Sequence, residues 1–530
     1  GAAGGGGGFG APGALRRTLT FRDLLVYGLL FIAPMAPVGI FGALQATSHG
    51  AVTLVYLVAT VAMAFTAFSY AQMVRVAPRA GSVYTYARVG LGEGAGFVAG
   101  WMAMLDYLLI PAVAYLFSGI ALHALVPSVH PWVWTALAVA VTTLLNLSGV
   151  RTAARAGFAV LAMEIVVLAV FVVSAVVELV VHGAPRGWAE PLTGEGGFSA
   201  GAVLAAVSVA VLSYLGFDAI ASFAEEAGGG EDGRGPGGPE RVARAVLSCL
   251  VVAGVLFAVQ TYLAALLMPV SAAELAARPA EQGAAFYATA DSAVGRWLQD
   301  LVAVSKAVGA AFAALAGQAA AGRLLFAMAR DRRLPGAMSK VDAGSGVPRR
   351  ALLGAALVTL VAAVGAARRD DGLAQLSSIV NVGALTAFGL LHASVIGWFW
   401  VRGRRGRPPL GRSGGLVGRG GELGGRGGGL VGRTGELGGR GGGLVGRTGE
   451  LGGRGGGLVG RTGELGGRTG ELGGGPPSVL RHAVVPLLGL AVVVAVVVEA
   501  SATAQLVGGV WLVSGLVVLA VQHGGRARAG

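Results

Sequence analysis

Apolar stretches of about 20 residues recur along almost the whole of this 530-residue chain. A helix of about that length crosses the ~30 Å hydrocarbon core of a bilayer, so each stretch is a candidate transmembrane helix. The composition agrees, because 54% of the residues are hydrophobic and only 13% are charged, too few to cover a water-soluble particle. We therefore predict an all-α integral membrane protein with twelve transmembrane helices, at residues 22–46, 51–76, 95–125, 132–150, 157–181, 200–226, 243–268, 297–328, 351–367, 373–401, 483–500 and 503–522.

The basic residues of the loops predict the orientation in the membrane. Leaving aside the long loop after the tenth stretch, alternate loops hold 19 arginines and lysines on one side and five on the other. Basic loops are retained on the cytoplasmic side, so both termini are predicted to be cytoplasmic, in a multi-pass protein of the cell membrane, inner or plasma. This asymmetry accounts for the net charge of +13, and no nucleic-acid partner is expected. Residues 1–14 lack the apolar core of a signal peptide.

Glycine-rich segments predict disorder between and beyond the helices. A 14-residue unit, GGLVGRTGELGGRG with small variations, runs from Gly414 to about Gly475. Its few leucine and valine side chains bury too little area to offset the entropy that glycine loses on ordering. We expect disordered cytoplasmic segments at 1–21 and 402–480 and a cytoplasmic tail at 524–530. Binding of RNA or anionic lipid by the repeat is the less favoured alternative, because the repeat has no aromatic residue to stack on bases.

Two of the predicted helices contain residues that interrupt a helix. The first carries Pro34 and Pro37 in the run FIAPMAPVGIFG, and the sixth carries Gly216 beside Asp218 in SYLGFD. Proline removes an amide donor, and irregular backbone at membrane depth survives only inside the protein or along a cavity. Interruptions at matching positions of two halves are typical of an inverted-repeat transporter with its site near the bilayer midplane. The alternative is that these residues merely kink packed helices.

Three motifs resemble the amino acid, polyamine and organocation transporter superfamily. They are YAQMVRVAPRAGSVYTYARVGLG at 70–92, LSYLGFDAIASFAEE at 212–226 and GRLLFAMARDRRLP at 322–335. Within the superfamily, FIAPMAPVGIFG together with GWMAMLDYLLIP is most similar to putrescine importers. The resemblance implies a LeuT-type fold, with inverted five-helix repeats at 22–181 and 200–401, two further helices at 481–523, and alternating access around a central site.

The resemblance also implies roles for particular residues. The unwound part of the first helix would offer amides to a substrate carboxylate, and that of the sixth would offer carbonyls to an ammonium group. Tyr107 matches a tyrosine of the substrate region in putrescine importers, and Asp218 matches an acidic position associated with proton-dependent gating. The candidate substrate-binding residues are therefore Ala33, Pro34, Met35, Ala36, Asp106, Tyr107, Leu215, Gly216, Phe217 and Asp218.

Charged side chains within the predicted spans each need a reason, because burying one at the bilayer centre costs on the order of 3 kcal/mol. Asp106 either attracts the amine of a substrate or bonds to a neighbouring helix, and Asp218 either titrates as a gate or meets the amine. Glu164 stands where many amino-acid transporters of the superfamily carry a lysine that replaces a coupling sodium ion. It either takes up a proton or pairs with Lys306. Glu225 and Glu226 are expected to form a solvated cap or a gate with an arginine such as Arg79.

These observations predict a secondary active transporter for amino acids or polyamines, coupled to protons or working as an exchanger. Its partners are a small amine-bearing solute, a coupling proton and the lipid bilayer. No cofactor or metal is expected, since the histidines near helix ends are isolated and the chain has a single cysteine. A receptor or scaffold with a transporter fold is the main alternative. An intramembrane enzyme is the second alternative, and the absence from the sequence of HExxH and of an intramembrane GxGD motif argues against it.

Overall fold

The computed structural model describes residues 19–402 and 478–528, except 80, 127, 149, 228–236, 343–347, 370–371, 499 and 501. The chain divides into one unit at 1–406 with 472–530 and a second at 407–471. The second unit lies entirely outside the described residues. The predicted disorder of the tails and of the glycine-rich repeat therefore concerns residues that are, for the most part, outside the description.

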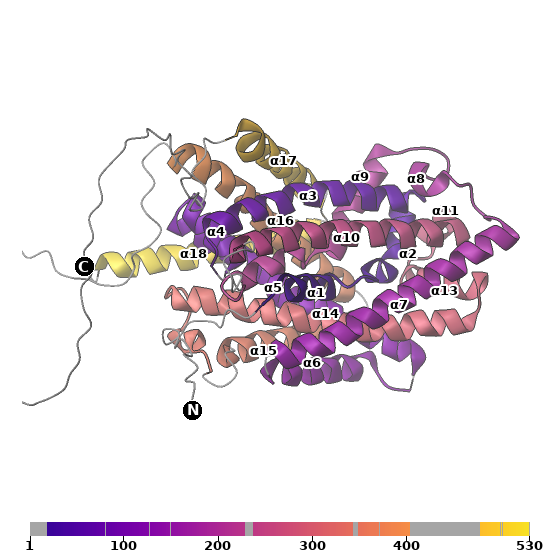
Figure 1. The fold of residues 1–530 in the computed structure, drawn as a ribbon, viewed down its shortest axis with the longest axis horizontal. Coiled ribbons are helices and arrows are strands. Elements are labelled where there is room, and N and C mark those ends of the chain that lie inside the picture. Colours follow the sequence, from indigo (N-terminus) through magenta and orange to yellow (C-terminus); the bar gives the residue numbers. More distant parts are fainter. Residues whose placement is uncertain are drawn as a thin grey trace, which may run out of the picture. The chain divides into compact units, whose positions relative to one another are not determined.

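The described part of the chain is helical, with one isolated parallel bridge between Leu19 and Ala227 (Figure 1). Its first half comprises α1 (Phe21–Ile32), η1 (Ala36–Gly39), α2 (Phe41–Thr47), α3 (Val52–Val76), α4 (Ser82–Gly90), α5 (Glu93–Leu125), α6 (Pro131–Leu147), α7 (Val150–His182) and α8 (Glu190–Thr193). Its second half comprises α9 (Ala200–Ala210), η2 (Val211–Tyr214), η3 (Phe217–Phe223), α10 (Gly238–Leu267), α11 (Ala272–Ala277), α12 (Pro279–Gln282), α13 (Ala285–Ala293), α14 (Arg296–Arg330), η4 (Gly336–Ser339), α15 (Arg349–Ala366), α16 (Gly372–Ile396), η5 (Gly397–Arg402), η7 (Leu480–Val484), α17 (Val485–Val498) and α18 (Ala502–Arg528).

Eleven helical segments of the described residues are long and apolar enough to span a membrane. The predicted span at 132–150 corresponds to the shorter apolar helix α6, which has 17 residues. At 1.5 Å per residue, α6 is about 26 Å long, slightly less than a typical hydrocarbon core. The all-α membrane fold is confirmed, and the total of twelve spans stays a prediction.

The interruptions predicted within the spans 22–46 and 200–226 are present in the structure. α1 ends at Ile32, Ala33 takes φ 60°, and the chain continues through the 3₁₀ turn η1 into α2. α9 passes into two 3₁₀ segments, η2 and η3, which are separated by Leu215 and Gly216, the latter at φ 121°. Pro34 and Pro37 supply no amide hydrogen, and a positive φ is readily adopted by glycine, so the interruptions follow from local chemistry.

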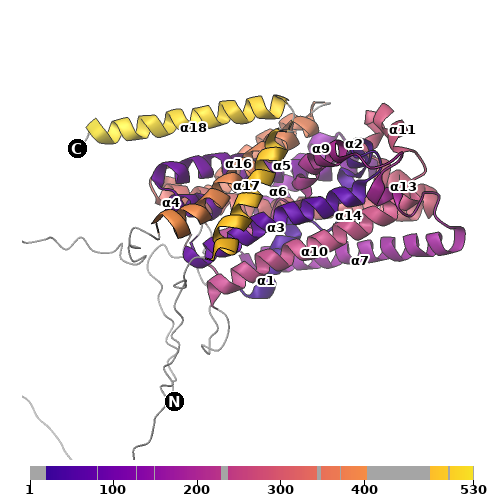
Figure 2. The ribbon, with the colours of Figure 1, turned by 90° about the horizontal axis from the view of Figure 1, so that it is seen from above.

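The interrupted segments lie inside a layer of long helices. α1 packs against α7, α10, α14 and η3, while α14 packs along α5 and α10 along α3. α3 and α10 lie side by side in both ribbon views (Figures 1 and 2). Gly317 of α14 permits close approach, since a Cβ there would lie 2.5 Å from the Phe31 ring and 2.8 Å from the Pro111 ring. The outer faces of α7, α15, α17 and α18 expose valine and leucine, as lipid-facing helices do.

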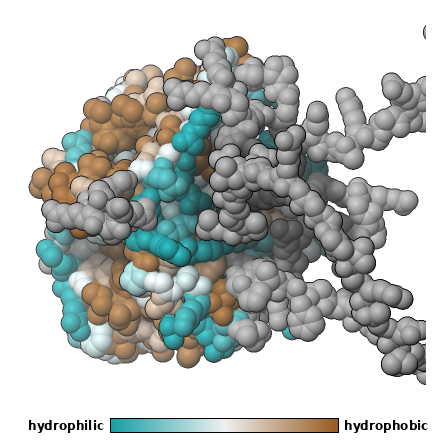
Figure 3. All heavy atoms as spheres, turned by 90° about the vertical axis from the view of Figure 1, so that its left-hand side faces the viewer, coloured by the Kyte–Doolittle hydropathy of each residue, from teal (hydrophilic) through white to brown (hydrophobic). Residues whose placement is uncertain are grey.

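One end of the helix bundle is polar. α1 and α10 begin at this end and α14 finishes there, and Figure 3 shows it as a band of hydrophilic residues between hydrophobic flanks. The predicted orientation makes this end cytoplasmic. We call it the basic end, because it carries Arg75, Arg88, Arg244 and Arg330.

Candidate functional site

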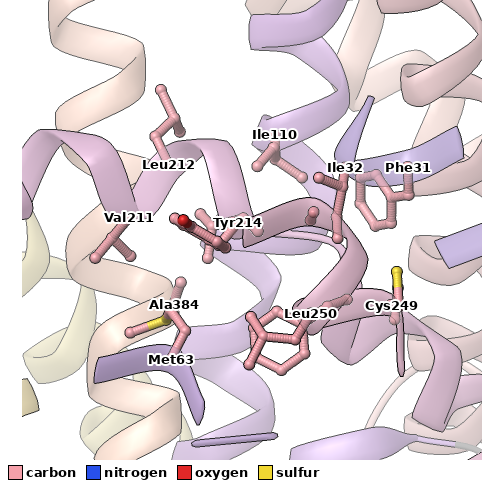
Figure 4. Packing of buried hydrophobic residues seen from close by; sticks show 14 of the residues in the cluster. Phe31, Ile32, Met63, Ile110, Val211, Leu212, Tyr214, Cys249, Leu250 and Ala384 are labelled. Atoms are coloured by element: carbon pink, nitrogen blue, oxygen red, sulfur yellow. The ribbon is translucent and has the colours of Figure 1, made fainter. Parts of the chain in front are cut away.

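The two interruptions meet and border a small buried cavity. A Cβ on Gly216 would lie 2.8 Å from Cγ of Phe31 and 3.2 Å from the backbone nitrogen of Ile32, so the sixth-helix break packs directly on the end of α1. The adjacent cavity has a volume of about 50 Å³. Phe31, Ile32, Ile110 and Leu212 line it, and the first three lie close together in Figure 4. Its walls come from α1, η1, α5, η2 and α14 and are mostly apolar, with Ser213 and Lys306 as the polar members.

The backbone at the first break is largely occupied by partners within the protein. The carbonyl of Pro34 accepts from Nε2 of Gln260 at 2.9 Å, and Nζ of Lys306 donates to the carbonyls of Met35 at 3.2 Å and Ala36 at 3.4 Å. The amides of Ala33, Ala36 and Val38 donate to carbonyls of their own segment. The expectation that the unwound part of the first helix offers free amides is therefore wrong for Ala33, Ala36 and Val38, whose amides are bonded within the segment, and for both prolines, which have no amide hydrogen.

Asp218 lies at the centre of a buried hydrogen-bonded cluster beside the second break. Its carboxylate accepts from the hydroxyl of Tyr107 at 2.8 Å, the hydroxyl of Tyr70 at 3.4 Å and the amide of Gly216 at 3.2 Å. The Tyr107 hydroxyl also lies 3.0 Å from Oγ of Ser82. All of these side chains are almost fully buried. Tyr107 and Asp218, which were predicted as separate candidates, are thus in contact, although the two residues are 111 positions apart.

Asp106 is a second buried carboxyl group next to this cluster. It is 2% exposed, its Oδ1 has no hydrogen-bond partner, and it interacts electrostatically with Asp218. Asp106 and Tyr107 lie on α5 one turn before Ile110, which lines the cavity. Burying an unpaired carboxylate charge is costly. These two buried acids, one with an oxygen that has no hydrogen-bond partner, are therefore suited to bind a cation or a proton.

Glu164 and Lys306 are two further ionisable side chains that lie buried among the helices. Glu164 is fully buried on α7, neither of its carboxyl oxygens has a hydrogen-bond partner, and it interacts electrostatically with Lys306, which is 3% exposed. The two groups do not form an ion pair within 4.0 Å, because Nζ of Lys306 is directed to the helix-one carbonyls. Gly309 makes room for the Glu164 carboxyl, where any Cβ would collide with it.

Ion pairs at the basic end join the end of the sixth-helix segment to α14. Nε and Nη2 of Arg323 donate to Glu226 at 2.5 and 3.1 Å, and the guanidinium lies 4.0 Å from the centroid of the Phe223 ring. Arg330 forms a similar, more exposed pair with Glu225. The two glutamates therefore do pair with arginines, but Arg79 is not the partner. α14 packs against η3, and this brings Arg323 of α14 next to Glu226, which follows η3 in the chain.

Several residues of the site were not predicted as members. Tyr70, Ser82 and Arg323 lie within the motifs that carried the resemblance, but nothing local marks them as partners of Asp218 or Glu226. Gln260 had a signal, since it is a lone amide in an apolar helix, and such a residue usually has a buried partner. The described residues contain no group of three or more His, Cys, Asp or Glu side chains suited to a metal ion.

A bundle of membrane-length helices, two of them broken against each other beside buried charges, defines a membrane transporter rather than an enzyme. The family model described as amino acid permease matches residues 24–417, so the chain belongs to that family. It is 29% identical over 399 residues to the low-affinity putrescine importer PlaP of Escherichia coli, covering 74% of this chain and 83% of the importer. It is 29% identical to the branched-chain amino acid permease BcaP of Lactococcus lactis, with the same coverage, and 28% identical to the methylthioribose transporter of Bacillus subtilis, covering 72% of this chain and 81% of that protein.

Proposed function

We propose that this permease is a secondary active transporter for a small amine-bearing solute, an amino acid or a polyamine, which it binds at the meeting point of the two helix breaks. The observation that carries this proposal is the pair of buried carboxyl groups Asp106 and Asp218. Asp106 lies one turn of α5 before Ile110, which lines the cavity, and Asp218 accepts a hydrogen bond from Tyr107, the residue next to Asp106. Asp106 lacks a partner for Oδ1, so an ammonium group placed between the two acids would supply the missing donor.

The cavity walls suit the rest of such a solute. Ile32, Ile110 and Val113 offer apolar contact to an aliphatic chain, and Lys306 lines the side of the cavity at the first break. An amino acid would direct its ammonium group to the acids and its carboxylate toward Lys306. A diamine would bring its second ammonium group toward the same lysine and be repelled. The cavity is smaller than such solutes, so binding requires the breaks to separate.

Alternating access follows from opening one end of the bundle at a time. The Arg323–Glu226 pair closes the basic end, which the loop charges assign to the cytoplasm along with both termini. Inverted repeats at 22–181 and 200–401 would let α1 and the sixth-helix segments rock against the other helices. Glu164 is the proposed proton carrier, since its carboxyl oxygens have no hydrogen-bond donor and the neutral form is less costly to bury. The proposed site also includes residues that contribute their backbone at the two breaks, namely Ala33, Pro34, Met35, Ala36, Leu215, Gly216 and Phe217.

The test is uptake of radiolabelled amino acids and polyamines by purified protein in proteoliposomes. D218N and D106N are expected to lower uptake at subsaturating solute by at least about thirtyfold, because truncating one partner of a buried charge pair costs roughly 2 kcal/mol or more. D291N, remote from the site on α13, is the control. Saturable binding without flux would instead identify a receptor. Uptake by D218N and D106N equal to that of D291N would refute the assigned site.

Lys306→Met separates the two solute classes. If the solute is an amino acid, removing the ammonium group beside the cavity lowers affinity, and if it is a diamine, affinity rises. Both results are read from the solute concentration at half-maximal uptake. An unchanged value for every transported solute would show that the solute does not reach Lys306.

A further inference from the structure

A groove at the basic end, remote from the proposed solute site, has the chemistry of a phospholipid site. It has a volume of about 340 Å³ and is lined by Phe21, Arg241, Arg244, Leu247 and Ser248. Phe21 begins α1 and Arg241 lies in the first turn of α10. The groove therefore contains two guanidinium groups, one hydroxyl and two large apolar side chains.

The depth of the groove places it among lipid headgroups. The candidate membrane spans Phe21–Gly39 and Gly238–Leu267 both begin at the groove. The first residues of a span lie where hydrocarbon gives way to the polar headgroups. The arginines are thus positioned at the level of the lipid phosphates. A guanidinium group can donate two parallel hydrogen bonds to two oxygens of one phosphate.

The surface of α10 continues the groove with an apolar track. Ser248 is followed on the same face of the helix by Val251, Val255 and Val259, at spacings of three and four residues. These valines are 61%, 57% and 41% exposed. A stripe with arginine at one end and exposed valine along its length is complementary to a phospholipid, whose phosphate would meet the arginines and whose acyl chain would lie along the valines. A free phosphate ion would contact only the arginine end.

The local charge favours an anionic headgroup. Glu240 is the carboxylate nearest the two arginines along α10, and it is shared by Arg244 at 3.2 Å and Arg75 at 2.8 Å. Arg22, which is exposed, follows Phe21 at the start of α1. Of the described residues that line the groove, two are arginines and none is acidic. The cytoplasmic leaflet, which the predicted orientation places here, carries anionic lipids.

We propose that the groove between the start of α1 and α10 binds one anionic phospholipid, with its phosphate on Arg241 and Arg244 and an acyl chain along Val251 and Val255. The proposal does not depend on which solute is transported. A lipid seated there would contact the first residue of α1, the helix that breaks at Ala33.

The experiment titrates the purified full-length protein in detergent with phosphatidylglycerol and counts retained lipid by native mass spectrometry. R241Q/R244Q is expected to weaken binding about thirtyfold, from roughly fivefold per basic residue at an anionic surface. R349Q/R350Q removes the same charge from exposed positions at the start of α15 and is expected to change binding by threefold or less. S248W keeps both arginines, fills the groove and is expected to abolish the tightly bound lipid.

Two further arms identify the source of the phosphate. Phosphatidylcholine is expected to bind at least tenfold more weakly than phosphatidylglycerol, and inorganic phosphate at millimolar concentration is expected not to displace the lipid. Equal losses in R241Q/R244Q and R349Q/R350Q would overturn the proposal by showing nonspecific attraction to surface charge. Displacement by inorganic phosphate, or undiminished binding by S248W, would also overturn it. Thermal unfolding of each variant confirms that the protein compared is folded.

Discussion

Replacing Glu226 with glutamine tests whether the buried pair with Arg323 closes the basic end of the transporter. The two side chains are 7% and 6% exposed, and two hydrogen bonds of 2.5 and 3.1 Å join them. Removing one partner of a buried ion pair costs about 3–5 kcal/mol. In E226Q the side-chain carbonyl oxygen of the glutamine can still accept one hydrogen bond from Arg323. Arg323 also keeps its hydrogen bond to the carbonyl of Ala319 at 2.8 Å and its contact with the Phe223 ring.

E226Q should therefore destabilise the conformation closed at this end by about half of that value, roughly 2 kcal/mol. This corresponds to an about thirtyfold shift of the equilibrium toward conformations open at this end. Ala319 lines a small cavity beside Arg323 and is 8% exposed, so A319C provides a reporter. The only natural cysteine, Cys249, is fully buried. We expect a membrane-impermeant maleimide, added on the side of the basic end, to label A319C about thirtyfold faster when E226Q is also present.

E225Q is the matched control, because its partner Arg330 is 38% exposed and an exposed pair contributes about 1 kcal/mol or less. Labelling of A319C should then rise at most about fivefold. Equal labelling rates in the E225Q and E226Q backgrounds would refute the assignment of the buried pair as the closing element. So would faster labelling from the opposite side of the membrane.

Three further predictions address coupling, the second break and the repeat. E164Q is expected to remove the dependence of uptake on the proton gradient, whereas E178Q on the same helix should retain it; an unaltered pH profile between pH 5 and 8 would dismiss Glu164. G216A should lower stability by about 3 kcal/mol, seen as a lower midpoint of thermal unfolding, because φ 121° is strained for alanine and its Cβ would press on the ring of Phe31. G354A, with no atom nearer than 3.6 Å to its Cβ, should be nearly neutral, and equal effects of the two changes would argue against strain. Replacing 407–471 with a short linker should leave uptake unchanged, and a loss of uptake would assign the repeat a function.

The sequence alone determined the features that depend on single residues or on residues close together along the chain. Apolar length predicted membrane-spanning helices, and Pro34, Pro37 and Gly216 predicted where two helices are interrupted, because a missing amide hydrogen and a positive φ are properties of single residues. The three quoted motifs predicted the family that the comparison then matched across residues 24–417. The resemblance placed Tyr107 and Asp218 among the candidate residues, but their contact is seen only in the structure.

Only the tertiary structure decided which groups face one another. Glu226 pairs with Arg323 across 97 positions instead of with Arg79. Lys306 donates to carbonyls 271 and 270 positions away instead of forming an ion pair with Glu164. Tyr70 joins Asp218 because α3 passes η3 at that depth. Apolar patterning fixes that a helix is buried in the bundle or the bilayer, but its rotation and sliding are set by packing against other helices. A shift of one residue, 100° of rotation, would give each buried charge a different partner.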